Sequence, residues 1–164
     1  MAGYGDDSGF AAWLAAQGLT LPPGATPAVL RQIGSDYVDA AYEPRLACSR
    51  RTGGYAQERA WPRSGHRLGR ETFPGDLIPP AWVNASYRAA YLQATNPGWA
   101  QGGNDPNRTT KREKVDVLER EFFAAGEGAV QGNAAAGFNV DPLIDGMVSV
   151  WLCPANHNIG FMVI

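Results

Sequence analysis

Residues 26–42, TPAVLRQIGSDYVDAAY, form the stretch that decides the fold of this chain. Thr26 followed by Pro27 is typical of a helix N-terminus, because a threonine side chain can cap free N–H groups and proline suits the first turn. Apolar residues then recur at every third or fourth position, which predicts an amphipathic helix that ends near Pro44. We expect a core-facing stripe of Val29, Leu30, Ile33, Tyr37, Val38 and Ala41, with Arg31, Gln32, Asp36 and Asp39 facing away.

The same signals predict three further helices. Residues 9–17 form a short helix that ends at Gly18, and Pro79-Pro80 begins a second long helix over residues 79–95. Small residues at positions 85, 86, 89, 90 and 94 permit close packing, so we expect this helix at the centre. Asp141-Pro142 begins a last helix that stops before Pro154. The predicted fold is mainly α: a small helical bundle with an extended β arm or hairpin and an extended C-terminal tail.

The length of 164 residues corresponds to one domain, at roughly 100–200 residues per domain. We assign residues 1–152 to a helical-bundle domain, with an arginine-rich loop at 45–78 and a β arm at 111–123, and residues 153–164 to a partner-binding tail. No apolar run approaches the roughly 20 residues of a membrane-spanning helix, so we expect a soluble protein that is not secreted. Cys48 and Cys153 form no CxxC motif, and we expect two free thiols in a reducing cytoplasm.

Residues 45–78 show no helical or alternating period and are rich in arginine. Between positions 45 and 70, seven arginines stand against one acid, Glu58, although the whole chain has a formal net charge of -2. The segment either meets an anionic partner or is an ordinary solvated loop. Trp61, which precedes a proline, is expected to anchor it on the core. The candidates for an anionic partner or a DNA channel are Arg50, Arg51, Arg59, Arg63, Arg67 and Arg70.

Three segments of unusual composition follow the second long helix. The charges of residues 111–123 suit a helix, but Val115 and Val117 alternate with polar neighbours, which favours an extended strand or hairpin arm. Residues 126–137 are a low-complexity spacer. The last stretch, 153–164, has no charged side chain, so it either binds a partner or packs as a last strand on its own core. Its apolar residues are Ile159, Phe161, Met162, Val163 and Ile164.

The sequence holds little that predicts catalysis. His66 and His157 have no Cys, His or acidic residue at ligand spacing, so we expect no metal site, and we expect His66 to be a solvent-exposed loop residue. Nucleotide-binding glycine loops and nucleophile motifs are absent from the sequence. Glu119 and Glu121 lie in a charge run typical of a solvated face. We expect a protein that is not an enzyme, with no catalytic residues, no cofactor and no metal.

Four stretches, taken in order, resemble one family of phage proteins. They are LRQIGSDYVDAAY at 30–42, Gln57 with AWPRSG at 60–65, Ile78-Pro79 leading into the helix at 85–94, and KREKVDVLEREF at 111–122. Together they resemble the tailed-phage proteins labelled DnaT-like single-stranded-DNA-binding, which are similar to the head-to-tail adaptor, or connector, proteins of long-tailed phages. The resemblance covers roughly residues 8–152.

This resemblance implies a structural virion protein at the head-to-tail interface, made in the host cytoplasm. Such adaptors form a homo-oligomeric ring, typically twelve-fold, which joins the portal protein to a tail terminator or stopper protein. The ring continues the channel for double-stranded DNA, which passes without sequence specificity. The tail would bind the portal, and the arm would contact the next subunit. The arm residues named for that contact are Lys111, Arg112, Lys114, Val115 and Val117.

The alternative function is a single-stranded-DNA-binding accessory protein of a phage. That function needs aromatic side chains interleaved with basic ones, so that bases can stack beside neutralised phosphates. Within the arginine-rich loop only Tyr55 and Trp61 qualify, and a tryptophan before a proline is more often an anchor.

Overall fold

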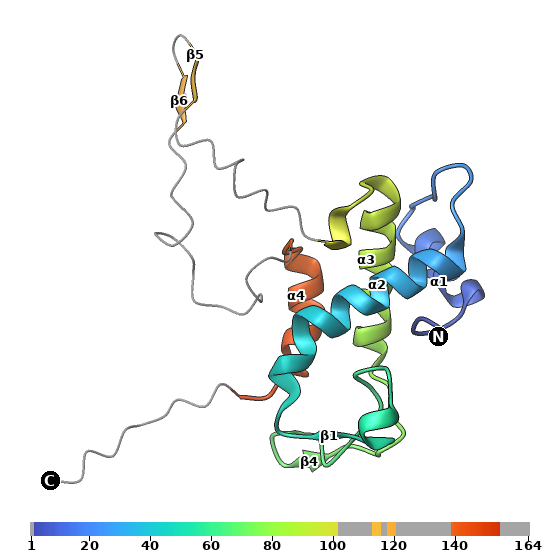
Figure 1. The fold of residues 1–164 in the computed structure, drawn as a ribbon, viewed down its shortest axis with the longest axis vertical. Coiled ribbons are helices and arrows are strands. Elements are labelled where there is room, and N and C mark those ends of the chain that lie inside the picture. The colour runs from blue at the N-terminus through green and yellow to red at the C-terminus, as the bar shows by residue number, and fades with distance from the viewer. Residues whose placement is uncertain (1, 102–112, 116–117, 121–138, 155–164) are drawn as a thin grey trace, which may run out of the picture.

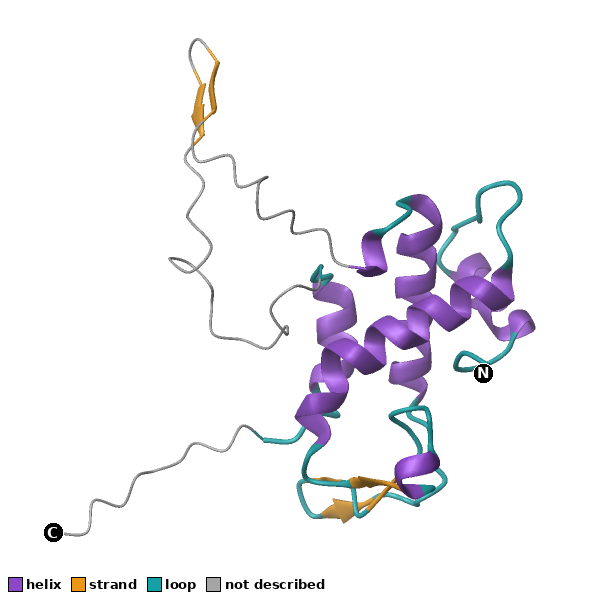
Figure 2. Ribbon diagram, in the orientation of Figure 1, coloured by secondary structure: helices purple, strands orange, loops and turns teal. Residues whose placement is uncertain are grey.

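The computed structural model describes residues 2–101, 113–115, 118–120 and 139–154. It is a small helix-rich domain with a few short antiparallel strands (Figure 2). Among these residues the α-helices are α1 (Asp7–Ala16), α2 (Pro27–Tyr42), α3 (Pro80–Thr95) and α4 (Pro142–Ser149). Short 3-10 turns are η1 (Glu43–Leu46), η2 (Gly54–Ala56) and η3 (Trp99–Gln101). The strands are β1 (Arg50–Arg51), β2 (Arg63–Ser64), β3 (Arg67–Leu68), β4 (Glu71–Thr72), β5 (Glu113–Val115) and β6 (Leu118–Arg120).

The starts of the helices confirm the predicted signals. The Asp141 side chain accepts hydrogen bonds from the backbone N–H groups of Leu143 (3.0 Å) and Ile144 (3.1 Å), and Pro142 opens α4. Thr26 lies at the N-cap of α2 and is followed by Pro27, although the Thr26 side chain makes no capping hydrogen bond. The α1 helix begins two residues earlier than predicted, because Asp6 caps it by accepting from the N–H of Gly9 at 2.6 Å.

Helices α2 and α3 cross at the centre of the domain, with α1 toward one end and α4 toward the other (Figure 1). Their backbones approach closely at Gly34, where a Cβ atom would lie 2.2 Å from the carbonyl oxygen of Ser86 and 2.6 Å from the nitrogen of Ala90. This contact confirms the close packing that the small residues of α3 predict.

In the described part of the chain, two apolar clusters hold the helices together. The larger one joins α2, α3, α4 and the segment around Trp61, and its largest fully buried side chains include Trp61, Trp82, Tyr42 and Leu46. The smaller one packs α1 onto α2 and α3 through Phe10, Leu14, Leu30, Tyr87 and Ala90. The sequence placed Arg31 and Asp39 on the outer face of α2 and Val29 on the inner face. Both placements are wrong, since Arg31 and Asp39 are buried while Val29 is 55% exposed.

The arginine-rich segment contains regular pairings that its sequence did not reveal. Strands β1 and β2 pair antiparallel, with Arg50 opposite Ser64, and β3 pairs with β4, with Arg67 opposite Thr72. Trp61, the expected anchor of this segment, is 1% exposed and packs against Trp82. The Trp61–Pro62 peptide bond is cis.

Strands β5 and β6 pair antiparallel, with Glu113 opposite Arg120, which confirms strand rather than helix for these residues. Lys114 and Val115 belong to β5. The other residues named for the arm, Lys111, Arg112 and Val117, lie outside the described residues, as do the spacer at 126–137 and the apolar tail residues 159–164. None of the helices among the described residues has the length and apolar character to cross a membrane.

The prediction of two free thiols is wrong. Cys48, just after η1, and Cys153, just after α4, form a disulfide with their Cα atoms 5.7 Å apart. The N–H of Cys153 also donates to the carbonyl of Arg45 at 3.0 Å. Sequence spacing could not reveal this pair, because α4 returns along the core to the turn that ends α2.

Candidate nucleic-acid interface

The candidate site is the arginine layer, which we define as residues 50–72, at the end of the domain that carries β1 to β4 (Figure 1). Buried contacts hold it against the helices. Trp61 meets Trp82 at 5.9 Å, Trp151 at 6.0 Å and His66 at 4.8 Å between ring centroids. The layer is therefore a fixed surface on the helical core.

Two of the predicted arginines are bound by one acid, Glu43. Arg51 binds its carboxylate through Nε at 2.6 Å and Nη2 at 2.5 Å, and Arg63 reaches it at 3.2 Å. Arg63 is 5% exposed and also donates to the carbonyls of Leu46 (3.0 Å) and Ser49 (2.6 Å). Burial alone would raise the pKa of Glu43, but the hydrogen bonds and charges of Arg51 and Arg63 outweigh it and lower that pKa.

A third arginine, Arg59, is held by acids of α2. Its Nη1 atom lies 2.8 Å from the carboxylate of Asp36 and 3.3 Å from that of Asp39, and its guanidinium stacks over the Tyr4 ring at 5.6 Å. Asp39 also accepts hydrogen bonds from the Tyr4 hydroxyl at 2.8 Å and from Nε1 of Trp82 at 3.1 Å. Burial raises the pKa of Asp39, and these hydrogen bonds oppose that rise.

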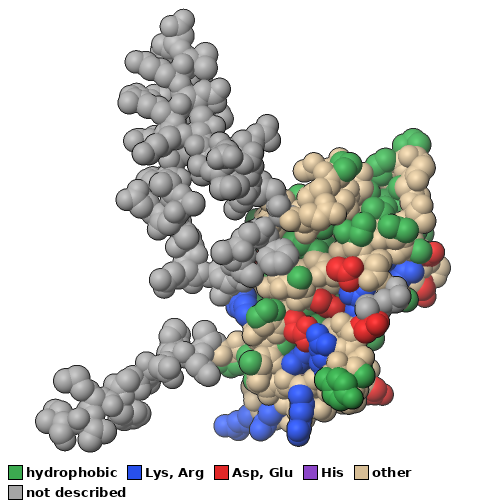
Figure 3. Space-filling model, in the orientation of Figure 1, with side chains coloured by type: hydrophobic (Ala, Val, Ile, Leu, Met, Phe, Trp, Pro, Cys, Tyr) green, Lys and Arg blue, Asp and Glu red, His purple; other side chains and the backbone are tan. Residues whose placement is uncertain are grey.

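The remaining three candidates point to solvent. Arg50 in β1, Arg67 in β3 and Arg70 in the following turn are exposed, and none has an ion pair among the described residues. Figure 3 shows Lys and Arg side chains gathered at this end of the domain. Tyr55 in η2 is also fully exposed, with a relative exposure of 102%. The layer thus presents three exposed arginines without an ion pair to a described residue, together with one exposed aromatic ring.

A comparison with protein families assigns the chain to one family. The family model described as "Putative DnaT-like ssDNA binding protein" matches residues 4–161. The chain belongs to this DnaT-like family. No curated protein and no solved structure matches it. The DnaT-like resemblance of the four quoted stretches is confirmed, while the likeness to head-to-tail adaptors stays a prediction.

In this DnaT-like protein, His66 is not the exposed loop residue that the sequence indicated. Its side chain is fully buried, with Nδ1 3.0 Å from the Ser49 hydroxyl and the ring 6.4 Å from that of Trp151. Burial lowers the pKa of His66, and the nearby charge of Arg63 lowers it further. The neighbouring glycines suggested a surface loop, but folding brings the rings of Trp61, Phe73 and Trp151 around the imidazole.

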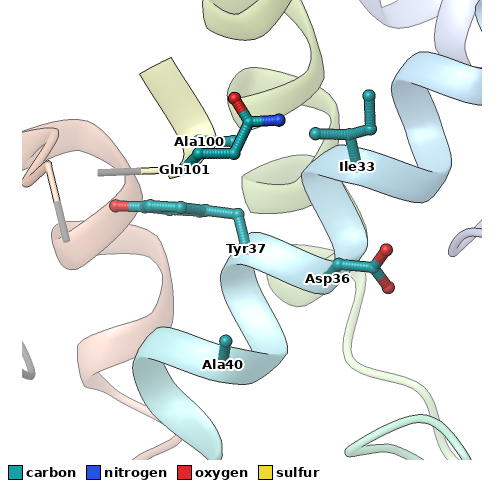
Figure 4. A pocket seen from close by; sticks show the side chains of 6 residues that line it. All are labelled: Ile33, Asp36, Tyr37, Ala40, Ala100 and Gln101. Atoms are coloured by element: carbon teal, nitrogen blue, oxygen red, sulfur yellow. The ribbon is translucent and has the colours of Figure 1, made fainter. Parts of the chain in front are cut away.

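The DnaT-like fold also contains a hollow of about 280 Å³ between α2 and η3, which the sequence did not predict (Figure 4). It is lined by Ile33, Asp36, Tyr37, Ala40, Ala100 and Gln101. The Asp36 carboxylate is turned toward Arg59, so the lining is mainly apolar with one amide and one phenol. Within the described ranges, no group of three His, Cys, Asp or Glu side chains is arranged to hold a metal ion.

Proposed function

We propose that this DnaT-like protein binds single-stranded DNA through Arg50, Arg67, Arg70 and Tyr55. One observation carries the proposal: the arginine layer divides its candidates into three that pair with acids of the same chain and three exposed ones without an ion pair to a described residue. The family description, which names single-stranded DNA, supports the same ligand.

The chemistry of each part follows from its exposure. The guanidinium groups of Arg50, Arg67 and Arg70 attract phosphates and displace the counterions of the strand. Tyr55 offers an exposed ring on which a base can stack, a contact worth about 1–3 kcal/mol. Arg51 and Arg63 contribute indirectly, because their bonds to Glu43 hold the layer in place. Such binding reads no sequence, since it contacts phosphates and a base face only.

Salt dependence tests how many arginines take part. Each neutralised phosphate on a single strand contributes about -0.7 to the slope of log K against log salt, so three contacts predict a slope of about -2 and six predict about -4. We expect the smaller slope for a labelled oligonucleotide measured by fluorescence anisotropy. A protein that shows no salt-dependent binding, or a slope near the larger value, contradicts the assignment.

Matched variants locate the site. Changing Arg50, Arg67 and Arg70 together to Gln is expected to remove most of the binding and the salt slope. Glu71→Gln, which removes an exposed acid from β4, should strengthen binding. Tyr55→Ser should weaken binding to single strands and leave duplex binding unchanged, because duplex bases are already stacked. Equal binding by the triple variant and the parent protein would place the site elsewhere.

A second candidate function is the head-to-tail adaptor of a phage virion. The observation that favours it is the uncharged apolar sequence of residues 159–164, which suits burial against another protein. In this function the helices form the bundle of a ring subunit, the β5–β6 hairpin contacts a neighbour, and the extended tail meets the portal. The assembled protein would lie in the virion between portal and stopper, and no catalytic step is required.

Co-sedimentation with a portal protein distinguishes the two functions. The adaptor predicts a closed ring on the portal in electron micrographs and loss of portal binding when the residues after Pro154 are deleted, with the helical circular dichroism retained. It also predicts no tight DNA binding by the free protein. Portal binding by the truncated protein would contradict the assigned role of the tail.

A further inference from the structure

Helix α4 carries apolar side chains on two sides, and only one side is covered by the described residues. Ile144 and Val148 are fully buried against α3 and the central cluster. Leu143 and Val150 are 57% and 63% exposed, and Met147 lies half-buried between them. Residues 143, 147 and 150 follow the i, i+4, i+7 spacing, so they form one stripe along the helix. We call these three residues the outer stripe of α4.

The sequence that carries the outer stripe holds few charges, and Asp141 at the start of α4 is paired with Arg88 at 3.0 Å. From residue 142 to residue 154 the only charged side chain is Asp145. Asp145 is two residues from Leu143, which places it about 200° around the helix and away from the stripe. In Figure 1, α4 lies at the edge of the domain away from α1. An apolar stripe without charged residues fits an apolar, uncharged occupant and not a nucleic acid.

Residues 155–164 have the right length and starting point to be that occupant. They begin directly after the described end of the chain at Pro154, which follows α4. The first four, ANHN, are polar and rich in asparagine, which favours a turn. At about 3.3 Å per residue, the last six span roughly 20 Å, whereas the eight residues of α4 are about 12 Å long at about 1.5 Å per residue. After a turn at residues 155–158, residues 159–164 are therefore long enough to run back along the whole of α4.

The side-chain spacings of the two partners are close on the first step and differ by about 2 Å on the second. In an extended chain, alternate residues lie about 6.6 Å apart on one side. The steps of the outer stripe are about 6 Å and 4.5 Å along the helix axis. We infer that in the free protein the tail folds back on α4, with Ile159, Phe161 and Val163 packed against the outer stripe. This contact goes beyond DNA binding, because it involves neither the exposed arginines nor Tyr55.

Photo-cross-linking of the full chain tests the contact. A benzophenone amino acid replaces Phe161, the protein is irradiated, and the linked residues are mapped by mass spectrometry. We expect links to residues 140–150 within single chains, with a yield that does not depend on protein concentration. The same probe at Tyr55, which is fully exposed in the arginine layer, should give no link to α4.

A pair of substitutions makes the test specific. Leu143→Asp places a charge in the outer stripe, in the first turn of α4, where an acid suits the helix dipole, so the helix should persist. We expect it to lower the cross-link yield at least fivefold, whereas Val29→Asp, at an equally exposed site on α2, should not. The inference is overturned by links between two chains that increase with concentration, by links to another part of the chain, by absence of links, or by a yield that Leu143→Asp leaves unchanged.

Discussion

Asp39 joins three separate segments of the chain through one buried carboxylate. It accepts hydrogen bonds from Tyr4 and Trp82 and from the backbone N–H of Ala60, and it pairs with Arg59. Replacing Asp39 with alanine leaves these donors without an acceptor inside the protein. The folded state then loses several hydrogen bonds to a charged group, and its free energy of unfolding falls. We expect Asp39→Ala to lower the free energy of unfolding by about 3 kcal/mol or more, measured by urea denaturation.

The matched control is Asp36→Ala on the same helix. Asp36 also pairs with Arg59, but its side chain is 57% exposed, and an exposed ion pair contributes at most about 1 kcal/mol. Comparable losses for the two variants would contradict the assigned role of Asp39, because they would show that pairing with Arg59, and not the buried network, determines stability.

His66 gives the protein a pH dependence whose sign can be worked out. Burial and then the charge of Arg63 lower its pKa below the usual 6.5, so the unfolded chain binds the proton more tightly. Stability is therefore expected to fall as the pH decreases through 6.5 toward the lowered value. His66→Phe should not show this loss. The difference in free energy of unfolding between the parent protein and this variant should therefore be smaller at pH 5.5 than at pH 7.5. Parallel pH profiles from urea titrations of both proteins would exclude a buried neutral His66.

At the scale of elements, the crossing of α2 and α3 depends on Gly34. A Cβ at this position would lie within 2.2 Å of the Ser86 carbonyl oxygen, which belongs to the backbone of α3 and cannot rotate away. Gly34→Ala should separate the helices and destabilise the protein by about 2 kcal/mol or more, as for an overpacked core. Its control is Gly146→Ala in α4, where the added Cβ would meet no atom of the described residues within 4 Å apart from the backbone of its own helix.

Gly146→Ala is expected to stabilise by about 0.5–1 kcal/mol, because alanine has the higher helix propensity. Thermal unfolding of both variants measures the two effects. If Gly34→Ala proves neutral, the two helices do not approach as closely as the structure describes.

Helix positions were predictable from sequence because their signals are local. A proline behind a capping residue and an apolar period identify α2 and α4 without knowledge of the rest of the chain. The orientation of single polar residues was not predictable in the same way. Asp39 and Arg31 look solvent-facing by periodicity, yet partners from the N-terminus bury them: Tyr4 binds Asp39, and the carbonyl of Gly5 accepts from Arg31 at 2.8 Å.

At the scale of the whole molecule, the sequence again did not show which polar residues of the candidate site have partners after folding. Composition identified the arginine-rich segment, and it could not separate the arginines held by acids from the exposed ones. That division depends on Glu43 and Asp36, which lie in another part of the sequence and reach the layer only after folding. Counting arginines in the sequence therefore overestimates the number available to an anionic ligand by a factor of two.

The Cys48–Cys153 disulfide leads to the prediction that concerns the molecule as a whole. It links residues that are 105 positions apart, so it restricts the unfolded chain strongly and should contribute about 2–4 kcal/mol. Trp151 and Leu152 hold the end of α4 on the core independently, through Trp61 and the central cluster. We therefore expect a reductant to lower the unfolding midpoint without abolishing the fold. The double variant Cys48→Ser/Cys153→Ser should match the reduced parent and be insensitive to reductant. An identical midpoint for the parent with and without reductant would mean that its two thiols are not paired in solution.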